Sequence, residues 1–264
     1  MILGFELTLH PFYTTETYAS VAHLPLAERL AQLRRPEVRT AMLAEAMDPD
    51  PALVLGRAVR DFEFMFLLGD EPNYEQPPEN SIAGRARAAG VTPEEYAYDV
   101  MVAGPSGGKL YLAMANFANG NLDAIGEIMG HPDVVFGLGD GGAHVGTICD
   151  GSYSTFALTH WARDRDHGRK SVADVVHRMT QATAQIMGLD DRGVLAPGLR
   201  ADINVIDHQA LAMGEPQVCY DLPAGGKRLV QRATGYDLTM VGGQIGYRRG
   251  EPTGTLPGRL VRTA

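Results

Sequence analysis

The stretch Val134-Val-Phe-Gly-Leu-Gly-Asp140-Gly-Gly-Ala-His144 decides how the rest of this chain is interpreted. Its first six residues are apolar or glycine and typical of a β-strand, and the run stops at an acid followed by two glycines. Glycine lets other backbone approach closely. In α/β barrels and doubly wound sheets, functional sites form at the carboxyl ends of strands. The stretch therefore predicts a strand over 134–139 with Asp140 at its functional end.

Asp140 has two interpretations that spacing alone leaves open. It is either a general base or metal-proximal carboxylate at the end of a strand, or a turn aspartate that bonds nearby backbone amides. Two histidines are weaker candidates for metal ligands: His144, four residues on, and His10, directly after an apolar run. A loop-anchoring role is the simpler interpretation of His144. A separate metal site built from His10, Asp140 and His144 stays open as a third possibility.

Several familiar motifs are absent from the sequence or fail in context. It contains no His-x-His, no His-Glu-x-x-His and no Cys-x-x-Cys. The segment Gly104-Pro-Ser106-Gly-Gly108 matches the spacing of a nucleophile elbow, but that motif needs a strand before the serine, and a helix is expected there. Ser106 is therefore predicted to lie in a turn. His131 and His160 are typical of capping or packing histidines.

Composition limits the classes of function. The chain has 264 residues, 45% of them hydrophobic, and a net charge of −9 without a basic run. Such a protein is a poor candidate for binding nucleic acid or an anionic membrane. Its two cysteines, Cys149 and Cys219, cannot form a disulfide framework. With no apolar run long enough to span a bilayer and no signal-peptide pattern, we expect a cytoplasmic protein.

Hydrophobic periodicity predicts helices first and short strands later in the chain. The expected order is a buried strand over 2–9, helices over 25–47 with a break before Pro36, a strand or buried turn over 62–68, a loop over 71–80, helices over 81–89 and 92–102, an apolar run over 110–117, helices over 121–129, 153–164 and 171–187, and a strand over 201–207 followed by short strands between glycine pairs. This order places a domain boundary near residue 194, which gives an α/β domain over 1–193 and a β domain over 194–264. Because the first strand begins with the first residues, we expect that something upstream is missing.

Several segments together resemble the D-aminoacylase branch of the amidohydrolase superfamily, the N-acyl-D-amino-acid deacylases and their relatives. The resemblance covers nearly the whole chain and is most specific around Asp140 and Leu222. It rests on the segments Gly4–Phe12, His23–Arg29, Leu138–Asp150, Thr159–Arg165, Gly193–Asp207, Tyr220–Ala233 and Gly254–Leu260.

The resemblance implies the C-terminal part of a metal-dependent-hydrolase (β/α)8 barrel of the TIM type. It also implies a long helical insertion at about 13–130 and the C-terminal strands of a small β-sandwich. The implied activity is hydrolysis of non-peptide C–N bonds in a small N-acyl amino acid or related amide, with zinc as the expected metal. In the family, the last-strand aspartate moves a proton between water and the leaving amine, a role that falls here on Asp140.

The family's other ligands, the His-x-His pair above all, have no counterpart in this sequence. We therefore expect the chain to be inactive alone and to meet a missing N-terminal half or a second copy. No arginine can be assigned to the substrate carboxylate. The alternative is a non-catalytic binding or interaction protein that reuses the half-fold.

Overall fold

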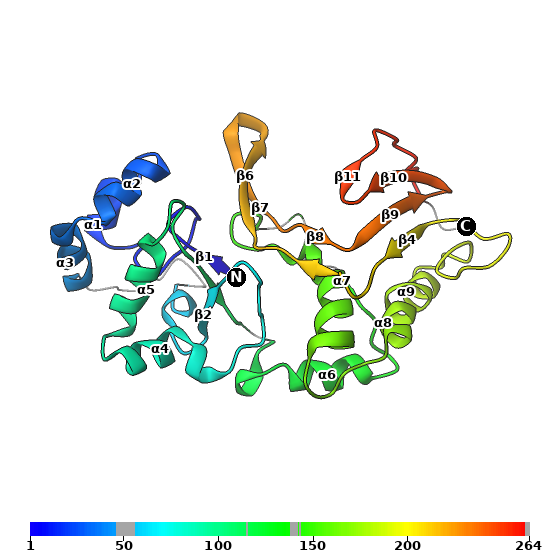
Figure 1. Cartoon of the computed structure of the whole chain (residues 1–264), viewed down its shortest axis with the longest axis horizontal. Helices are drawn as coiled ribbons and strands as arrows, with labels where there is room; N and C mark the ends of the chain where they lie inside the picture. Colours follow the sequence, from blue (N-terminus) through cyan, green and yellow to red (C-terminus); the bar gives the residue numbers. More distant parts are fainter. Residues whose placement is uncertain (46–55, 115, 138–141, 143, 262–264) are drawn as a thin grey trace. The chain divides into compact units, whose positions relative to one another are not determined.

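The computed structural model describes residues 1–45, 56–114, 116–137, 142 and 144–261. They fall into two compact units that interleave along the sequence. The first unit comprises Met1–Leu122, Gly142–Cys149 and Gln217–Val230, and the second comprises Asp123–Gly141, Asp150–Pro216 and Gln231–Ala264. Figure 1 follows the chain through both. The sequence analysis divides the chain once, near residue 194, and that domain boundary stays a prediction.

With one exception, the helices of the first unit lie close to where periodicity predicts them; the segment that forms the first helix was not predicted to be helical. They are α1 (Glu16–Val21), α2 (Leu26–Leu33), α3 (Pro36–Ala44), α4 (Ile82–Ala89) and α5 (Pro93–Val102). Pro36 separates α2 from α3 as expected, because proline lacks the N–H that a helix interior needs. Thr92 caps α5: its hydroxyl accepts from the Glu95 N–H, and the Glu95 carboxylate accepts from the Thr92 N–H at 2.9 Å.

A three-stranded antiparallel sheet runs through the first unit, in the order β1 (Ile2–Leu3), β3 (Lys109–Leu112), β2 (Met65–Leu68). The strand predicted over 2–9 is therefore much shorter than expected. After Leu3 the chain folds back on itself, because the Leu7 N–H donates to the Gly4 carbonyl and the Gly4 N–H donates to the Leu9 carbonyl. The loop so formed, residues 4–9, is called the 4–9 turn below.

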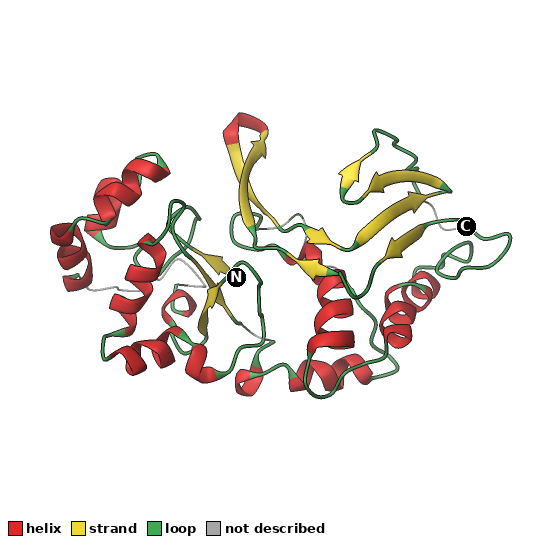
Figure 2. Cartoon of the chain, viewed as in Figure 1, coloured by secondary structure: helices red, strands yellow, loops and turns green. Residues whose placement is uncertain are grey.

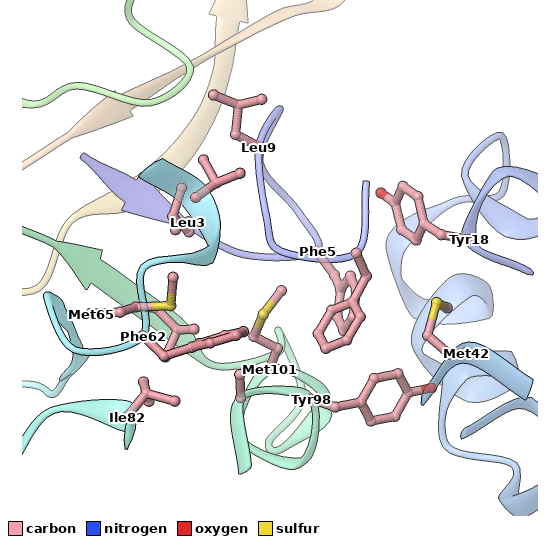
Figure 3. Close-up of a cluster of buried hydrophobic side chains, with 14 of the residues drawn as sticks. Leu3, Phe5, Leu9, Tyr18, Met42, Phe62, Met65, Ile82, Tyr98 and Met101 are labelled. Carbon is pink, nitrogen blue, oxygen red and sulfur yellow. The ribbon is translucent and has the colours of Figure 1, made fainter. Parts of the chain in front are cut away.

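The main core of the first unit combines aromatic rings with methionine and aliphatic side chains (Figure 3). Phe5 stands at its centre, stacked on Tyr18 at 5.7 Å and edge-on to Tyr98 at 5.9 Å between ring centroids. The Tyr98 hydroxyl donates to the Leu33 carbonyl, and burial raises the pKa of Tyr98 to about 12. The 4–9 turn thus has its own anchor in the core.

The first unit also contains a hairpin from late in the sequence. It consists of β6 (Gln217–Leu222) and β7 (Gly226–Val230), joined by a tight turn in which Ala224 has φ 58° and Gly225 has φ 73°. Both residues there take the left-handed conformation that glycine adopts most easily. We call this element the β6–β7 hairpin.

The helices of the second unit include a segment of unusual winding. They are α6 (Asp123–Gly130), α7 (Tyr153–Phe156), a π-helix at Ala157–Asp164 that continues α7, α8 (Val172–Met179) and α9 (Gln181–Ile186). Ser171 caps α8 at the predicted start of a helix, its hydroxyl accepting from the Asp174 N–H at 3.0 Å. The helix expected over 171–187 is broken at Thr180, whose φ and ψ are −120° and −82°.

The strands of the second unit are short and antiparallel (Figure 2). One sheet has the order β11 (Glu251–Pro252), β10 (Gln244–Arg248), β9 (Tyr236–Val241), β4 (Ile203–Ile206), and a two-stranded ladder joins β5 (Ala212–Met213) to β8 (Ala233–Thr234). β4 confirms the strand predicted over 201–207. Every strand pair between the described residues is antiparallel, so the parallel barrel sheet stays an expectation.

Candidate functional site

Asp140, the strongest candidate in the sequence, lies outside the described residues. Of the strand predicted before it, positions 134–137 are described, and they do not form a strand. The Val134 N–H donates to the His131 carbonyl at 3.2 Å in a turn. The Arg178 guanidinium donates to the carbonyls of both residues at 3.1 and 3.2 Å. These contacts occupy the N–H and the carbonyl of Val134, the first residue of the predicted strand.

His144 serves the structure through its backbone. Its φ is 50°, a left-handed conformation uncommon outside glycine. Its carbonyl accepts from the N–H of Thr147 at 2.8 Å, from the N–H of Ile148 at 3.0 Å and from the Thr147 hydroxyl at 3.2 Å. The side chain itself is exposed. This arrangement agrees with a loop-anchoring residue, and a metal-binding role for His144 stays a prediction.

His10 is fully buried within the aromatic core. Its ring lies edge-on to Tyr18 at 4.1 Å and edge-on to Phe5 at 4.9 Å between centroids. Burial, with a further contribution from the Arg29 charge, lowers the pKa of His10 to about 3. The imidazole is therefore neutral at ordinary pH.

The hydrogen bonds of His10 place its proton. Nδ1 accepts from the Phe12 N–H at 3.2 Å, so the proton of the neutral ring resides on Nε2. That N–H is buried and has no hydrogen-bond partner among the described residues. A ring nitrogen that carries a proton has no lone pair for a metal. Ligation by Nε2 would require the other tautomer, in which the Phe12 contact is lost.

The other residues considered in the sequence have the structural roles expected of them, in capping, packing or a turn. His131 Nδ1 accepts from the Asp133 N–H at 3.2 Å just after α6. His160 stacks on Phe156 with centroids 4.6 Å apart. Ser106 is exposed in the turn between α5 and β3, as predicted.

The sequence analysis did not identify two cationic side chains that donate hydrogen bonds to the 4–9 turn. The Arg29 guanidinium donates to the Phe5 carbonyl at 2.6 Å, and the Lys227 ammonium donates to the Glu6 carbonyl. The two cations therefore bind adjacent carbonyls of one turn, and burial together with the Arg29 charge lowers the pKa of the Lys227 ammonium. The sequence predicts a helix around Arg29, but no local pattern links this arginine to a lysine 198 positions away.

The described residues do not fit a metal centre by themselves. They contain no group of three His, Cys, Asp or Glu side chains that could hold an ion. His10 is buried with its proton on Nε2, whereas His144 is exposed. Zinc, the ion expected from the resemblance, therefore stays a prediction. Within this same part of the chain, no helix is long and apolar enough to cross a membrane.

Solved structures similar to this chain are those of D-aminoacylase. One, described as defining a novel subset of amidohydrolases, is 20% identical, with 72% of this chain and 36% of that chain covered and a TM-score of 0.35. A D-aminoacylase mutant in complex with CuCl2 is 20% identical, with 86% and 44% covered and a TM-score of 0.36. A third, from a study of the binuclear metal center in D-aminoacylase, is 21% identical at the same coverage and TM-score.

The chain spans less than half the length of each of these proteins. A comparison with curated proteins gives no match. The sequence pattern that defines the amidohydrolase family matches residues 1–247. Because this match takes in most of the 264 residues, the chain belongs to the amidohydrolase family.

Proposed function

We propose that this chain is part of a metal-dependent hydrolase that cleaves non-peptide C–N bonds. The observation that carries the proposal is the amidohydrolase pattern over residues 1–247. The substrate class we propose is a small N-acyl amino acid or a related amide. It is supported by the resemblance of the Asp140 and Leu222 segments to the N-acyl-D-amino-acid deacylases.

Asp140 is the residue of this chain that we assign to the chemistry. A carboxylate held next to the attacking water can take its proton and return that proton to the leaving amine. Both transfers are needed for amide hydrolysis, because water is a weak nucleophile and an amide anion is a poor leaving group. The proposed role of this chain is therefore proton transfer by Asp140.

The metal ligands come, in this proposal, from a segment outside the 264 residues. Two observations support this: the sequence lacks the His-x-His motif, and the described residues contain no cluster of three ligating side chains. The isolated chain is accordingly proposed to be inactive.

The test measures metal content by mass spectrometry and hydrolysis of a panel of N-acetyl-D-amino acids. The purified chain is assayed alone and together with a neighbouring gene product that carries a His-x-His motif. We expect neither bound metal nor turnover from the chain alone, and both from the combination. Asp140→Asn should abolish turnover, whereas Asp133→Asn, at an exposed carboxylate nearby in sequence, should retain it.

Three outcomes would contradict parts of the proposal. Metal and turnover from the chain alone would place the ligands within it, with His10 and His144 the first to replace. Turnover that survives Asp140→Asn would remove that residue from the chemistry. A stable chain that never gains activity with the second segment would support the non-catalytic binding protein.

A further inference from the structure

The β6–β7 hairpin belongs to the first unit, although the chain on both sides of it belongs to the second. Leu229 of β7 is buried, and Val218 lies opposite it on β6. Both pack with Ile2 of β1 and with Leu7 of the 4–9 turn. Side chains alternate along a strand, so Lys227 shares the inward face of Leu229.

The hairpin holds the segment of residues 142–149 through a backbone contact. The Leu229 N–H donates to the Val145 carbonyl at 2.7 Å. The same segment is held from β1, because the Ile2 N–H donates to the Thr147 carbonyl at 2.8 Å. The His144 turn lies within this doubly anchored segment. In the sequence, Asp140 lies two positions before the start of the 142–149 segment.

The hairpin holds the 4–9 turn through two side chains. Lys227 donates to the Glu6 carbonyl, and the Tyr220 hydroxyl donates to the Glu6 carboxylate at 3.2 Å. The 4–9 turn leads directly into His10. It also approaches the 142–149 segment closely, since a Cβ at Gly146 would lie 3.0 Å from the Thr8 hydroxyl. One hairpin therefore contacts both stretches, which in turn touch each other.

Lys227 is the contact whose loss should matter most. Its side chain is half-buried, and burial and the Arg29 charge lower the pKa of its ammonium, against the opposing effect of Glu6. A desolvated cation needs strong acceptors, and a charge-assisted hydrogen bond to a carbonyl supplies one. The lysine and the 4–9 turn therefore depend on each other.

We propose that Lys227 is a positioning residue: from the β6–β7 hairpin, whose Leu229 N–H holds the 142–149 segment, its ammonium holds the 4–9 turn against that segment. The 4–9 turn leads into His10, and the 142–149 segment contains His144; both histidines are candidates named from the sequence. Any catalytic importance of this arrangement rests on the proposed function, because the two stretches would have to be fixed relative to each other for hydrolysis. The arrangement itself can be tested without any activity.

The experiment is hydrogen–deuterium exchange of the full 264-residue chain, with peptides resolved by mass spectrometry. Lys227→Met removes the charge and keeps the apolar stem. We expect exchange in peptides covering 4–9 to become about tenfold faster, the change that loss of one charge-assisted hydrogen bond produces in a local opening. Peptides covering 142–149 should change less, because the backbone bonds from Leu229 and Ile2 remain and only the approach of Thr8 to Gly146 is loosened. Peptides of α4 and α5 should exchange as in the wild type, and Lys227→Arg should restore most of the protection.

Arg228→Met is the matched control. This neighbour is exposed, points to the opposite side of β7 and pairs with Asp221 within the hairpin at 2.7 and 2.8 Å. It should leave both stretches unchanged. Unaltered exchange in Lys227→Met would overturn the proposal, and so would faster exchange spread evenly over α4 and α5, which indicates general destabilisation. Neither result bears on hydrolysis, so failure of the positioning role is distinguishable from failure of the proposed function.

Discussion

Nδ1 of His10 accepts the backbone N–H of Phe12 across 3.2 Å, inside a cage of aromatic rings that excludes water from the imidazole. Because burial lowers the pKa of His10 to about 3, the folded protein holds this ring neutral at pH values where an unfolded chain would protonate it.

The stability of the protein should therefore fall in acid through His10. The unfolded histidine, with a pKa near 6.5, binds a proton between pH 6.5 and 3, and the folded one does not. Over that window the free energy of unfolding should drop by about 1 kcal/mol per pH unit from this residue. Urea unfolding at pH 7.5 and 5.5 measures the drop. His10→Asn, which keeps an acceptor near the Phe12 N–H, should show a smaller drop in the free energy of unfolding than the wild type. Replacement of the exposed His23 by Asn should leave the drop as large as in the wild type. Equal drops in all three proteins would contradict the buried neutral ring.

Arg165 should contribute to the stability of the second unit mainly by packing. Its guanidinium lies 4.7 Å from the centre of the Trp161 ring and donates to Asp123, while the arginine is almost fully buried. Arg165→Ala should lower the free energy of unfolding by about 2 kcal/mol, through lost stacking and an emptied space. The ion pair adds little, since Asp123 is half exposed and screened by water.

Thermal or urea unfolding measures the effect, and Arg169→Ala is its control. Arg169 is exposed and makes one hydrogen bond through its side chain, to the Arg163 carbonyl at 3.1 Å. It should change stability by less than about 0.5 kcal/mol. Similar losses in both variants would show that Arg165 acts as an ordinary surface arginine.

Gly84 should not accept a side chain. A Cβ there would lie 2.5 Å from the Glu79 carbonyl oxygen and 2.7 Å from that of Pro78, and backbone cannot move aside cheaply. Gly84→Ala should cost about 3 kcal/mol of stability despite the higher helix propensity of alanine. Gly69→Ala, with nothing within 4 Å of the added carbon, should be close to neutral. Denaturant titration compares the two, and a stable Gly84→Ala would mean that α4 packs differently.

Thr92 should account for a measurable part of the stability of α5. Its hydroxyl caps a helix whose Ala97, Tyr98 and Met101 are buried in the core. Thr92→Ala should lower the free energy of unfolding by about 1 kcal/mol, while Thr92→Ser retains most of it. Thr40→Ala, in the interior of α3, is the control and should be nearly neutral. A loss in Thr40→Ala as large as in Thr92→Ala would argue against the cap.

The helices were predictable because their signals are local. Pro36, Thr92 and Ser171 act on the backbone within one helical turn, and each marks a helix start in the structure. The strand over 2–9 failed because its apolar pattern does not reveal that the chain turns back after Leu3. Buried strands and buried turns have the same composition.

The candidate site was less predictable because its contacts are remote in sequence. His10 could be named as a histidine after an apolar run, but its burial depends on Tyr18 and on Phe5, and its proton on the Phe12 N–H. The contact between Lys227 and Glu6 joins residues 221 positions apart. No periodicity or motif encodes such a pair. The role of Asp140 follows from resemblance, and it stays a prediction.

The π-helix at Ala157–Asp164 has a consequence for length variation among relatives of this protein. Its hydrogen bonds span one residue more than those of an α-helix, so the segment stores one extra residue. Deleting a single codon there can restore ordinary α-helical winding without opening the helix. Because the wider turn had absorbed the extra residue, residues beyond the deletion would keep nearly the same orientation around the helix axis. Homologues one residue shorter at this point would keep the helix and the outward and inward faces of its flanking turns, and would lose only the wider winding.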